Sequence, residues 1–320
     1  MWKTVLRRVL VMIPQLFILS ILIFILAKKM PGDPFTGLIT PQTSPAVLEE
    51  LRRKAGFYDP WHVQYIRWMG NAFKGNFGMS YTYKLPVSTL IGQRVNNTFI
   101  LSLFSMTLTY MLAIPLGILS GRYQNSLLDR SVTLYNYVSY TIPTFVLSLI
   151  MVWFFGYTLG WFPTTGSVTI GLTPGTFKYF IDRIHHIMLP AITYALLATT
   201  GTIQYLRNEI IDAKSLDYVK TARSKGVPEN VVYSRHIFRN SILPIAAFFG
   251  YSITGLLSGS IFIERIFSYP GMGNLFISSI GSRDYSVVTA LILLFGFLTL
   301  IGSLLSDIIL SIVDPRIRIE

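Results

Sequence analysis

The chain has 320 residues, of which 52% are hydrophobic and only 13% are charged, and its mean hydropathy is +0.52. Soluble domains carry about 25% charged residues, so this composition argues against a water-soluble globular protein. The net charge of +12 fits a nucleic-acid binder or a membrane protein with basic cytoplasmic loops, and the long uncharged stretches favour the membrane protein. The absence of cysteine excludes disulfides and thiolate metal ligands, and four histidines make a poor case for a metal site.

Six uncharged stretches are long enough to cross a bilayer. A helix needs roughly 20 apolar residues to span the hydrocarbon core. Five gaps between charged residues each match one span, and a sixth span fits the first part of a longer gap, residues 131–177. Its second part is rich in Gly, Pro, Ser and Thr and does not suit a lipid-exposed helix. The predicted spans lie within residues 9–27, 95–121, 131–158, 184–206, 240–263 and 285–306.

The first apolar stretch also fits a signal peptide, because Lys3, Arg7 and Arg8 precede it. It is longer than the hydrophobic region of a typical signal peptide and lacks a small-residue cleavage site. Lys28 and Lys29 follow it directly. We therefore expect it to remain as a transmembrane helix.

The distribution of lysine and arginine predicts the topology. With six spans, the loop 207–239 and both termini lie on one side, and that loop holds seven cations. The positive-inside rule places this side in the cytoplasm. The loop 28–94 carries nine cations on the other side, but loops longer than about 60 residues translocate largely regardless of charge.

The long outer loop contains signals for local structure. Met30–Pro34 is a turn signal, and residues 45–51 predict a short helix with Ser44 as its N-cap. Apolar residues over 63–69 predict a second helix. The loop is interpreted as a small packed cap on the outer face, or alternatively as a docking surface for an extracellular partner.

The inner loop predicts two helices joined by a sharp break. Ser215 suits the N-cap of a helix over Leu216–Lys225, and Gly226 suits its C-terminal end because glycine adopts the left-handed conformation cheaply. Pro228 suits the first turn of a second helix. We call this arrangement the elbow. The alternative is a solvated basic loop lying on anionic lipid headgroups.

At the elbow, the chain resembles the coupling-loop motif of ABC importer permeases. The matching residues are Lys220-Thr221-Ala222, Gly226 and Ile242-Leu243-Pro244. Lys220 and Thr221 replace the motif's Glu and Ala, and eighteen positions separate Gly226 from Pro244, which is longer than the general motif. Both departures are typical of the peptide-permease branch.

The resemblance extends along the chain. Further matching runs are Pro31-Gly32-Asp33-Pro34, Tyr65-Ile66-Arg67-Trp68, Lys74-Gly75-Asn76-Phe77-Gly78, Ile142-Pro143-Thr144-Phe145, Met188-Leu189-Pro190-Ala191-Ile192, residues 264–273, Arg283-Asp284-Tyr285 and Asp314-Pro315-Arg316. Asn76 stands where this family usually has Asp. The chain resembles the first of the two membrane subunits of an oligopeptide or dipeptide ABC importer. The same branch also resembles carriers of nickel, glutathione or haem, and the spans lack the His, Met or Asp clusters of a metal carrier.

This resemblance implies an all-α integral membrane protein of the type I ABC importer permease fold, with six transmembrane helices and cytoplasmic N and C termini. The expected organisation is an N-terminal transmembrane helix (1–30), an extracellular loop or cap (31–94), a five-helix permease core (95–308) containing the coupling loop 207–240, and a cytoplasmic tail (309–320). The expected location is the bacterial cytoplasmic membrane.

The resemblance also implies a transport subunit without catalytic residues. The chain contains no Gly-Lys dipeptide and hence no P-loop, so ATP and Mg would bind to two separate cytoplasmic ATPases. The other implied partners are a second permease, an extracellular peptide-binding protein, the peptide substrate and the lipid bilayer. The expected ATPase-contact residues are Leu216, Asp217, Tyr218, Val219, Lys220, Thr221, Ala222, Arg223, Lys225, Gly226, Val227, Pro228, Glu229 and Arg235.

Two other functional classes stay open on the residues alone: a proton-driven peptide carrier and a membrane scaffold. A proton-driven carrier needs ionisable groups within its spans, and the predicted spans hold none apart from His185 and His186 at the mouth of the fourth. Neutral polar residues in the spans suit a peptide pathway, or they bond between helices. The candidates for the pathway are Tyr137, Tyr140, Thr144, Thr193, Thr200, Ser252, Thr254 and Ser258.

Overall fold

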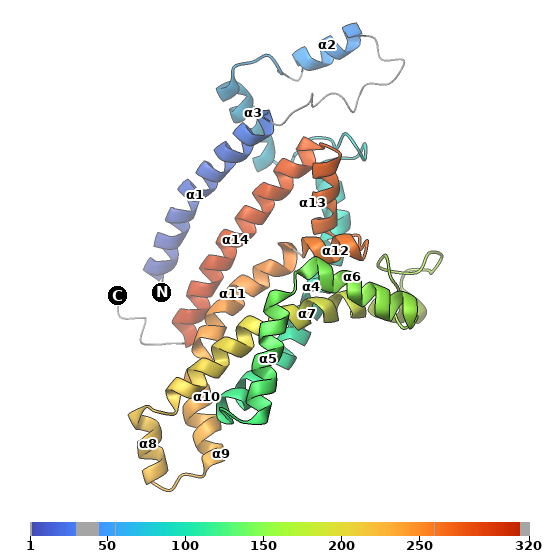
Figure 1. Ribbon diagram of the computed structural model, residues 1–320. Helices are drawn as coiled ribbons and strands as arrows, with labels where there is room; N and C mark the ends of the chain where they lie inside the picture. Colours follow the sequence, from blue (N-terminus) through green and yellow to red (C-terminus); the bar gives the residue numbers. More distant parts are fainter. Residues whose placement is uncertain (1, 30–44, 55, 259, 314–320) are drawn as a thin grey trace.

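The computed structural model describes residues 2–29, 45–54, 56–258 and 260–313. Apart from an isolated bridge between Met79 and Pro86, the regular structure of these residues is helical (Figure 1). The prediction of an all-α protein is confirmed. The predicted Ser44 N-cap, the Met30–Pro34 turn and the Asp314-Pro315-Arg316 run lie outside the described residues.

Four of the described helices are long and apolar enough to cross a membrane. They are α1 (Trp2–Lys29), α4 (Val87–Arg122), α7 (Phe177–Ala213) and α14 (Tyr285–Val313). Each contains one of the predicted spans, so these four predictions are confirmed.

The predicted span within residues 131–158 is bent rather than straight. Helix α5 (Leu127–Thr141) is followed by α6 (Thr144–Met151), which continues as the π-helix η2 (Val152–Thr158), and the two halves meet at 102°. Pro143 explains the break, because a residue before proline is driven out of the helical region and Ile142 has φ −79° and ψ 120°. The predicted span is one crossing only if the two halves are counted together.

The predicted span within residues 240–263 is also divided. It consists of α10 (Phe238–Ser241), α11 (Leu243–Ser258) and the start of α12 (Ile261–Ile266). Pro244 lacks a backbone N–H, so the hydrogen-bond ladder of α10 does not continue unbroken into α11. The 16 residues of α11 are too few for a span on length alone. The described residues therefore give four candidate spans, or five with the bent pair, and not the six predicted.

Helices α4 and α7 pack closely because α4 presents two glycines to α7. A Cβ atom on Gly117 would lie 3.0 Å from the Cβ of Leu206, and one on Gly121 would lie 2.8 Å from the Cβ of Ile210. Small residues four apart let two membrane helices approach until their backbones nearly touch. This contact fixes α4 against α7.

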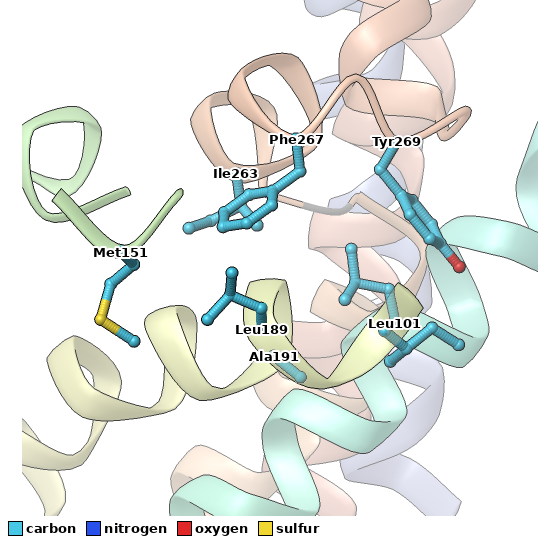
Figure 2. Packing of buried hydrophobic residues seen from close by; sticks show 8 residues of the cluster. Leu101, Met151, Leu189, Ala191, Ile263, Phe267 and Tyr269 are labelled. Atoms are coloured by element: carbon cyan, nitrogen blue, oxygen red, sulfur yellow. The ribbon is translucent and has the colours of Figure 1, made fainter. Parts of the chain in front are cut away.

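A hydrophobic cluster joins α4 and α7 to α6 and α12. Figure 2 shows Leu189 of α7 facing Phe267 and Ile263, with Met151 on one side. The Tyr269 hydroxyl, on the other side, donates to the carbonyl of Asn97 at 3.4 Å. The bent pair and the α12 region are thus packed onto the α4–α7 pair.

Two short helices lie beyond the end of α1 and the start of α14 (Figure 1). Helices α2 (Pro45–Lys54) and α3 (Trp61–Phe73) contain the two predicted outer helices. A hydrogen bond of 2.7 Å between Ser20 and Tyr65 joins α1 to α3. After α13 (Met272–Gly281), Asp284 accepts hydrogen bonds from Ser80 and from the Thr82 amide, which joins the loop before α4 to the start of α14.

Adding one methyl group at Gly121 tests the α4–α7 contact. Gly121→Ala places a Cβ against Ile210, and we expect a loss of about 1–3 kcal/mol, seen as a lower melting temperature in detergent. Gly92→Ala on the same helix is the matched control, because no heavy atom lies within 4 Å of its added Cβ. It should leave the melting temperature unchanged or raise it. Equal effects of the two substitutions would contradict the close packing.

Candidate functional site

The elbow lies at the end of the molecule opposite α3 (Figure 1). It consists of α8 (Asp217–Ser224) and α9 (Glu229–Val231), and the predicted helix over Leu216–Lys225 is confirmed to within one residue at each end. The predicted N-cap is wrong by one position. Leu216 is the N-cap, and the Ser215 hydroxyl instead donates to the carbonyl of Asp212 at 2.8 Å.

Gly226 sets the sharp break, as predicted. Its φ of +75° lies in the left-handed region. The Gly226 amide donates to the carbonyl of Arg223 at 2.9 Å, and the Val227 amide donates to that of Ala222 at 3.2 Å. These bonds satisfy the last carbonyls of α8 and direct the chain into α9. Pro228 is the N-cap of α9 and not its first helical residue, and α9 leads into the π-helix η3 (Val232–Ile237).

One face of α8 is buried against the membrane helices. Val219 is fully buried and Ala222 is 6% exposed, and both belong to a cluster with Ile210 of α7 and Ile237 of η3. Leu216, three positions before Val219, does not join this face, because it is 48% exposed. The elbow is therefore anchored by an apolar face and carries an exposed leucine at its tip.

Polar contacts also attach the elbow to the end of α4. Lys214 donates to the carbonyls of Gly121 and Arg122, and burial lowers the pKa of its ammonium group. The Arg122 guanidinium donates to the side chain of Asn230 at 2.7 Å and lies 4.8 Å from the centre of the Tyr233 ring. Both sides of the Gly226 turn are thus bonded to the same helix end.

Two ion pairs lie on the exposed surface of the elbow. Arg223 and Glu229 meet at 2.7 Å across the turn, and this contact raises the pKa of Arg223. Lys220 pairs with Asp217 at 3.0 Å within α8. Of the predicted contact residues, the exposed ones are Leu216, Asp217, Lys220, Thr221, Arg223, Lys225, Gly226, Pro228, Glu229 and Arg235; Tyr218 and Val227 are half-buried; and Val219 and Ala222 are buried.

A buried ion pair lies just above the elbow. Asp129 of α5 is 2% exposed, and Arg207 of α7 donates to both of its carboxylate oxygens, at 2.6 and 2.9 Å. The Ser120 hydroxyl of α4 donates to the same carboxylate at 2.5 Å, and the Asn125 amide donates at 2.8 Å. Four donors therefore compensate this carboxylate for its loss of water, and they join α4, α5 and α7 at one point.

A cavity of about 360 Å³ lies between α4, α7, α11 and α12. None of its lining residues is charged, and more than half carry a hydroxyl group. The Tyr110 hydroxyl of α4 and the Ser252 hydroxyl of α11 meet at 3.0 Å beside it. The hydroxyl-bearing lining residues are Ser102, Ser105, Thr109, Tyr110, Tyr194, Thr202, Ser252 and Ser260.

Of the candidate pathway residues, Ser252 lines this cavity. Thr193 is fully buried and donates to the carbonyl of Leu189 at 2.7 Å within α7. Thr200 and Thr254 are buried, and Thr144 is half-buried. Tyr137 and Tyr140 are 70% and 86% exposed on α5. Ser258 ends α11, and its side chain lies outside the described part of the structure.

Sequence reasoning missed the Asp129–Arg207 pair. In the sequence, Arg207 is one of the seven cations of the loop 207–239 that predict the topology. Asp129 lies between two uncharged stretches, and no function is predicted for it. One available signal was a carboxylate three residues after Ser126, which is the N-cap of α5 and accepts from the Asp129 amide at 3.2 Å. Across the residues that the structure describes, no three His, Asp or Glu side chains gather in a way that could hold a metal ion.

Two family models match the chain. Residues 113–319 match the family of binding-protein-dependent transport system inner membrane components. Residues 1–102 match the N-terminal family of binding-protein-dependent transport system membrane components. Together they cover α1, α2, α3, the elbow and most of α4, and they leave residues 103–112 unmatched.

Two curated proteins illustrate the similarity over nearly the full length. The oligopeptide transport system permease protein AppB of Bacillus subtilis (strain 168) is 41% identical over 315 residues, which is 98% of each chain. The glutathione transport system permease protein GsiC of Escherichia coli O1:K1 / APEC is 32% identical over 318 residues, which is 99% of each chain.

Removing either partner of the buried ion pair tests its role in the fold. Asp129→Asn and Arg207→Gln each leave a charge without its partner, and we expect each to lower the free energy of unfolding by about 3 kcal/mol. The double variant should lose less than the sum of the two, because the two side chains interact directly. Thermal or denaturant unfolding in detergent gives these values.

The exposed pair of Asp217 and Lys220 provides the matched control. These side chains are 96% and 65% exposed, so Asp217→Asn and Lys220→Gln should leave the unfolding free energy nearly unchanged. If Asp129→Asn is no more destabilising than Asp217→Asn, the buried pair does not hold the three helices together.

Proposed function

The chain belongs to the family of binding-protein-dependent transport system inner membrane components, and on that basis we propose that its cargo is an oligopeptide. It is a multi-pass inner membrane protein and a non-catalytic permease subunit of an ABC transport system. The 41% identity to a permease of an oligopeptide transport system supports this cargo over a metal ion. The 32% identity to a glutathione permease is compatible with it, because glutathione is itself a small peptide.

We infer six crossings of the type I ABC importer permease fold: α1, α4, the bent pair from α5 to η2, α7, α11 and α14. In Figure 1, the start of α1, the end of α14 and the elbow lie at the same end of the bundle, and α3 lies at the other. The positive charge of the elbow supports a cytoplasmic assignment for the first end. The segments 1–30, 31–94, 95–308 and 309–320 then serve as first span, extracellular cap, permease core and cytoplasmic tail.

The neutral cavity is the proposed part of the peptide pathway in this chain, with a second permease supplying the other half. A peptide presents backbone donors and acceptors that need partners once they leave water. The hydroxyl groups of Ser102, Tyr194 and Thr202 offer both. Because the cavity wall carries no charge, it favours no particular pattern of charges on the peptide. It also offers no ionisable group to bind a coupling ion, which suits a driving force supplied from outside the bilayer.

The elbow is the proposed contact with a cytoplasmic ATPase. ATP and Mg would bind to two such ATPases, and a peptide-binding protein would deliver cargo to the cap formed by α2 and α3. The exposed side chain of Leu216 suits an apolar pocket, while Lys225 and Arg235 add exposed positive charge. The observation that carries the proposal is the double anchoring of the elbow, by its apolar face and by Lys214 and Arg122.

Exchanging the charges of Arg223 and Glu229 tests how the elbow works. Arg223→Glu places two carboxylates across the turn, and we expect peptide uptake to fall at least tenfold while membrane insertion and basal ATPase activity persist. Combining it with Glu229→Arg restores the pair in reverse and should recover most of the uptake, because the pair acts by holding the turn. If uptake survives Arg223→Glu unchanged, the shape of the elbow is not needed for coupling.

Blocking the cavity tests the transport pathway. Ser102→Trp fills much of the space, so cells carrying it should take up labelled di-, tetra- and octapeptides at least tenfold more slowly than wild-type cells, although the complex still assembles with its ATPases. Ser102→Ala and Leu103→Trp are the controls, because the first leaves the cavity open and Leu103 is exposed on the neighbouring face. Normal uptake by Ser102→Trp would exclude this cavity as the pathway.

A further inference from the structure

A second cavity of about 620 Å³ lies between α1, α3 and α14. It shares no lining residue with the cavity between α4, α7 and α11. Lys28 at the end of α1 and Tyr285 at the start of α14 both line it. The cavity therefore lies where two apolar helices end and the polar cap begins, and the proposed peptide pathway does not use it.

The ammonium group of Lys28 is held in place on the cavity wall. It donates to the side-chain oxygen of Gln64, and the amide nitrogen of Gln64 donates to the carbonyls of Phe57 and Asp59 at 2.9 and 2.6 Å. These two bonds fix the Gln64 amide with its oxygen toward Lys28. The ammonium also lies 5.2 Å from the centre of the Phe57 ring and 5.8 Å from that of Phe24. A lysine at a span end is thus ordered by three neighbours rather than extended freely into solvent.

The cavity favours an anion. Its lining includes the cations Lys28 and Arg67 and no carboxylate. Asp59, the ion-pair partner of Arg67 at 2.7 Å, is not a lining residue. Trp61 and Trp68 also line the cavity, and tryptophan is enriched at membrane–water interfaces.

We propose that this cavity binds the headgroup of an anionic phospholipid from the leaflet that α3 covers, with its phosphate at Lys28. The aromatic lining side chains of Phe24, Phe57 and Trp68 offer an apolar surface beside the phosphate. A peptide fits less well, because its ammonium terminus would find no carboxylate on the cavity wall. A zwitterionic lipid is disfavoured for the same reason.

Lipid binding by the purified full-length chain, in complex with its partner subunits, tests the proposal. Native mass spectrometry after addition of phosphatidylglycerol or phosphatidylethanolamine should show preferential retention of phosphatidylglycerol. Lys28→Gln should reduce that retention about fivefold, whereas Lys28→Arg should preserve it. Lys29→Gln is the matched control, because Lys29 is exposed and does not line the cavity.

Three results would overturn the proposal. The first is equal retention of the two lipids by the wild-type complex, which needs no variant. The second is equal loss of phosphatidylglycerol from Lys28→Gln and Lys29→Gln. The third is displacement of the bound lipid by trialanine or by free glycerol phosphate, which would assign the cavity to a peptide or to a soluble phosphate. None of these readouts depends on peptide uptake, so the proposed transport function is tested separately.

Discussion

Removing the Asp129 carboxylate from water is the constraint around which the half of this molecule that carries the elbow is arranged. A buried carboxylate is tolerated only when donors replace its hydration, and here the donors come from Arg207, Ser120 and the Asn125 amide. Since these groups belong to α4, α7 and the turn before α5, the three helices are held in one relative position. The close approach at Gly121, one residue after Ser120, makes this geometry possible.

The elbow is attached to one end of the unit formed by α4 and α7, and the neutral cavity lies along the middle of the same two helices. At the elbow, Lys214 and Arg122 form hydrogen bonds that attach it to the end of α4, and Val219 packs onto α7. Further along the same helices, Ser102 of α4 and Tyr194 of α7 line the cavity. A displacement of the elbow would therefore reach the cavity walls through rigid helices, which is how a motor outside the bilayer can open or close a pathway within it.

The sequence was sufficient for features that depend on local chemistry. The lengths of the uncharged stretches predicted four of the membrane spans correctly, and Gly226 predicted the position of the break in the elbow. It was insufficient where tertiary contacts decide: the residue pattern marks a break before Pro143 but not its angle of 102°, and Leu216 shares the spacing of Val219 but is 48% exposed. The partner of Asp129 lies 78 positions away, so no local pattern could identify it.

Whether the elbow and the membrane helices move as one body is the central question, and a distance within the chain answers it. The chain has no cysteine, so spin labels attached after the substitutions Ser224→Cys on α8 and Leu134→Cys on α5 would be unique in it. Electron paramagnetic resonance on the assembled transporter should give the same interlabel distance, within about 2 Å, with and without ATP. A change of several ångströms on ATP binding would mean that the elbow moves independently of α5, and it would contradict this account.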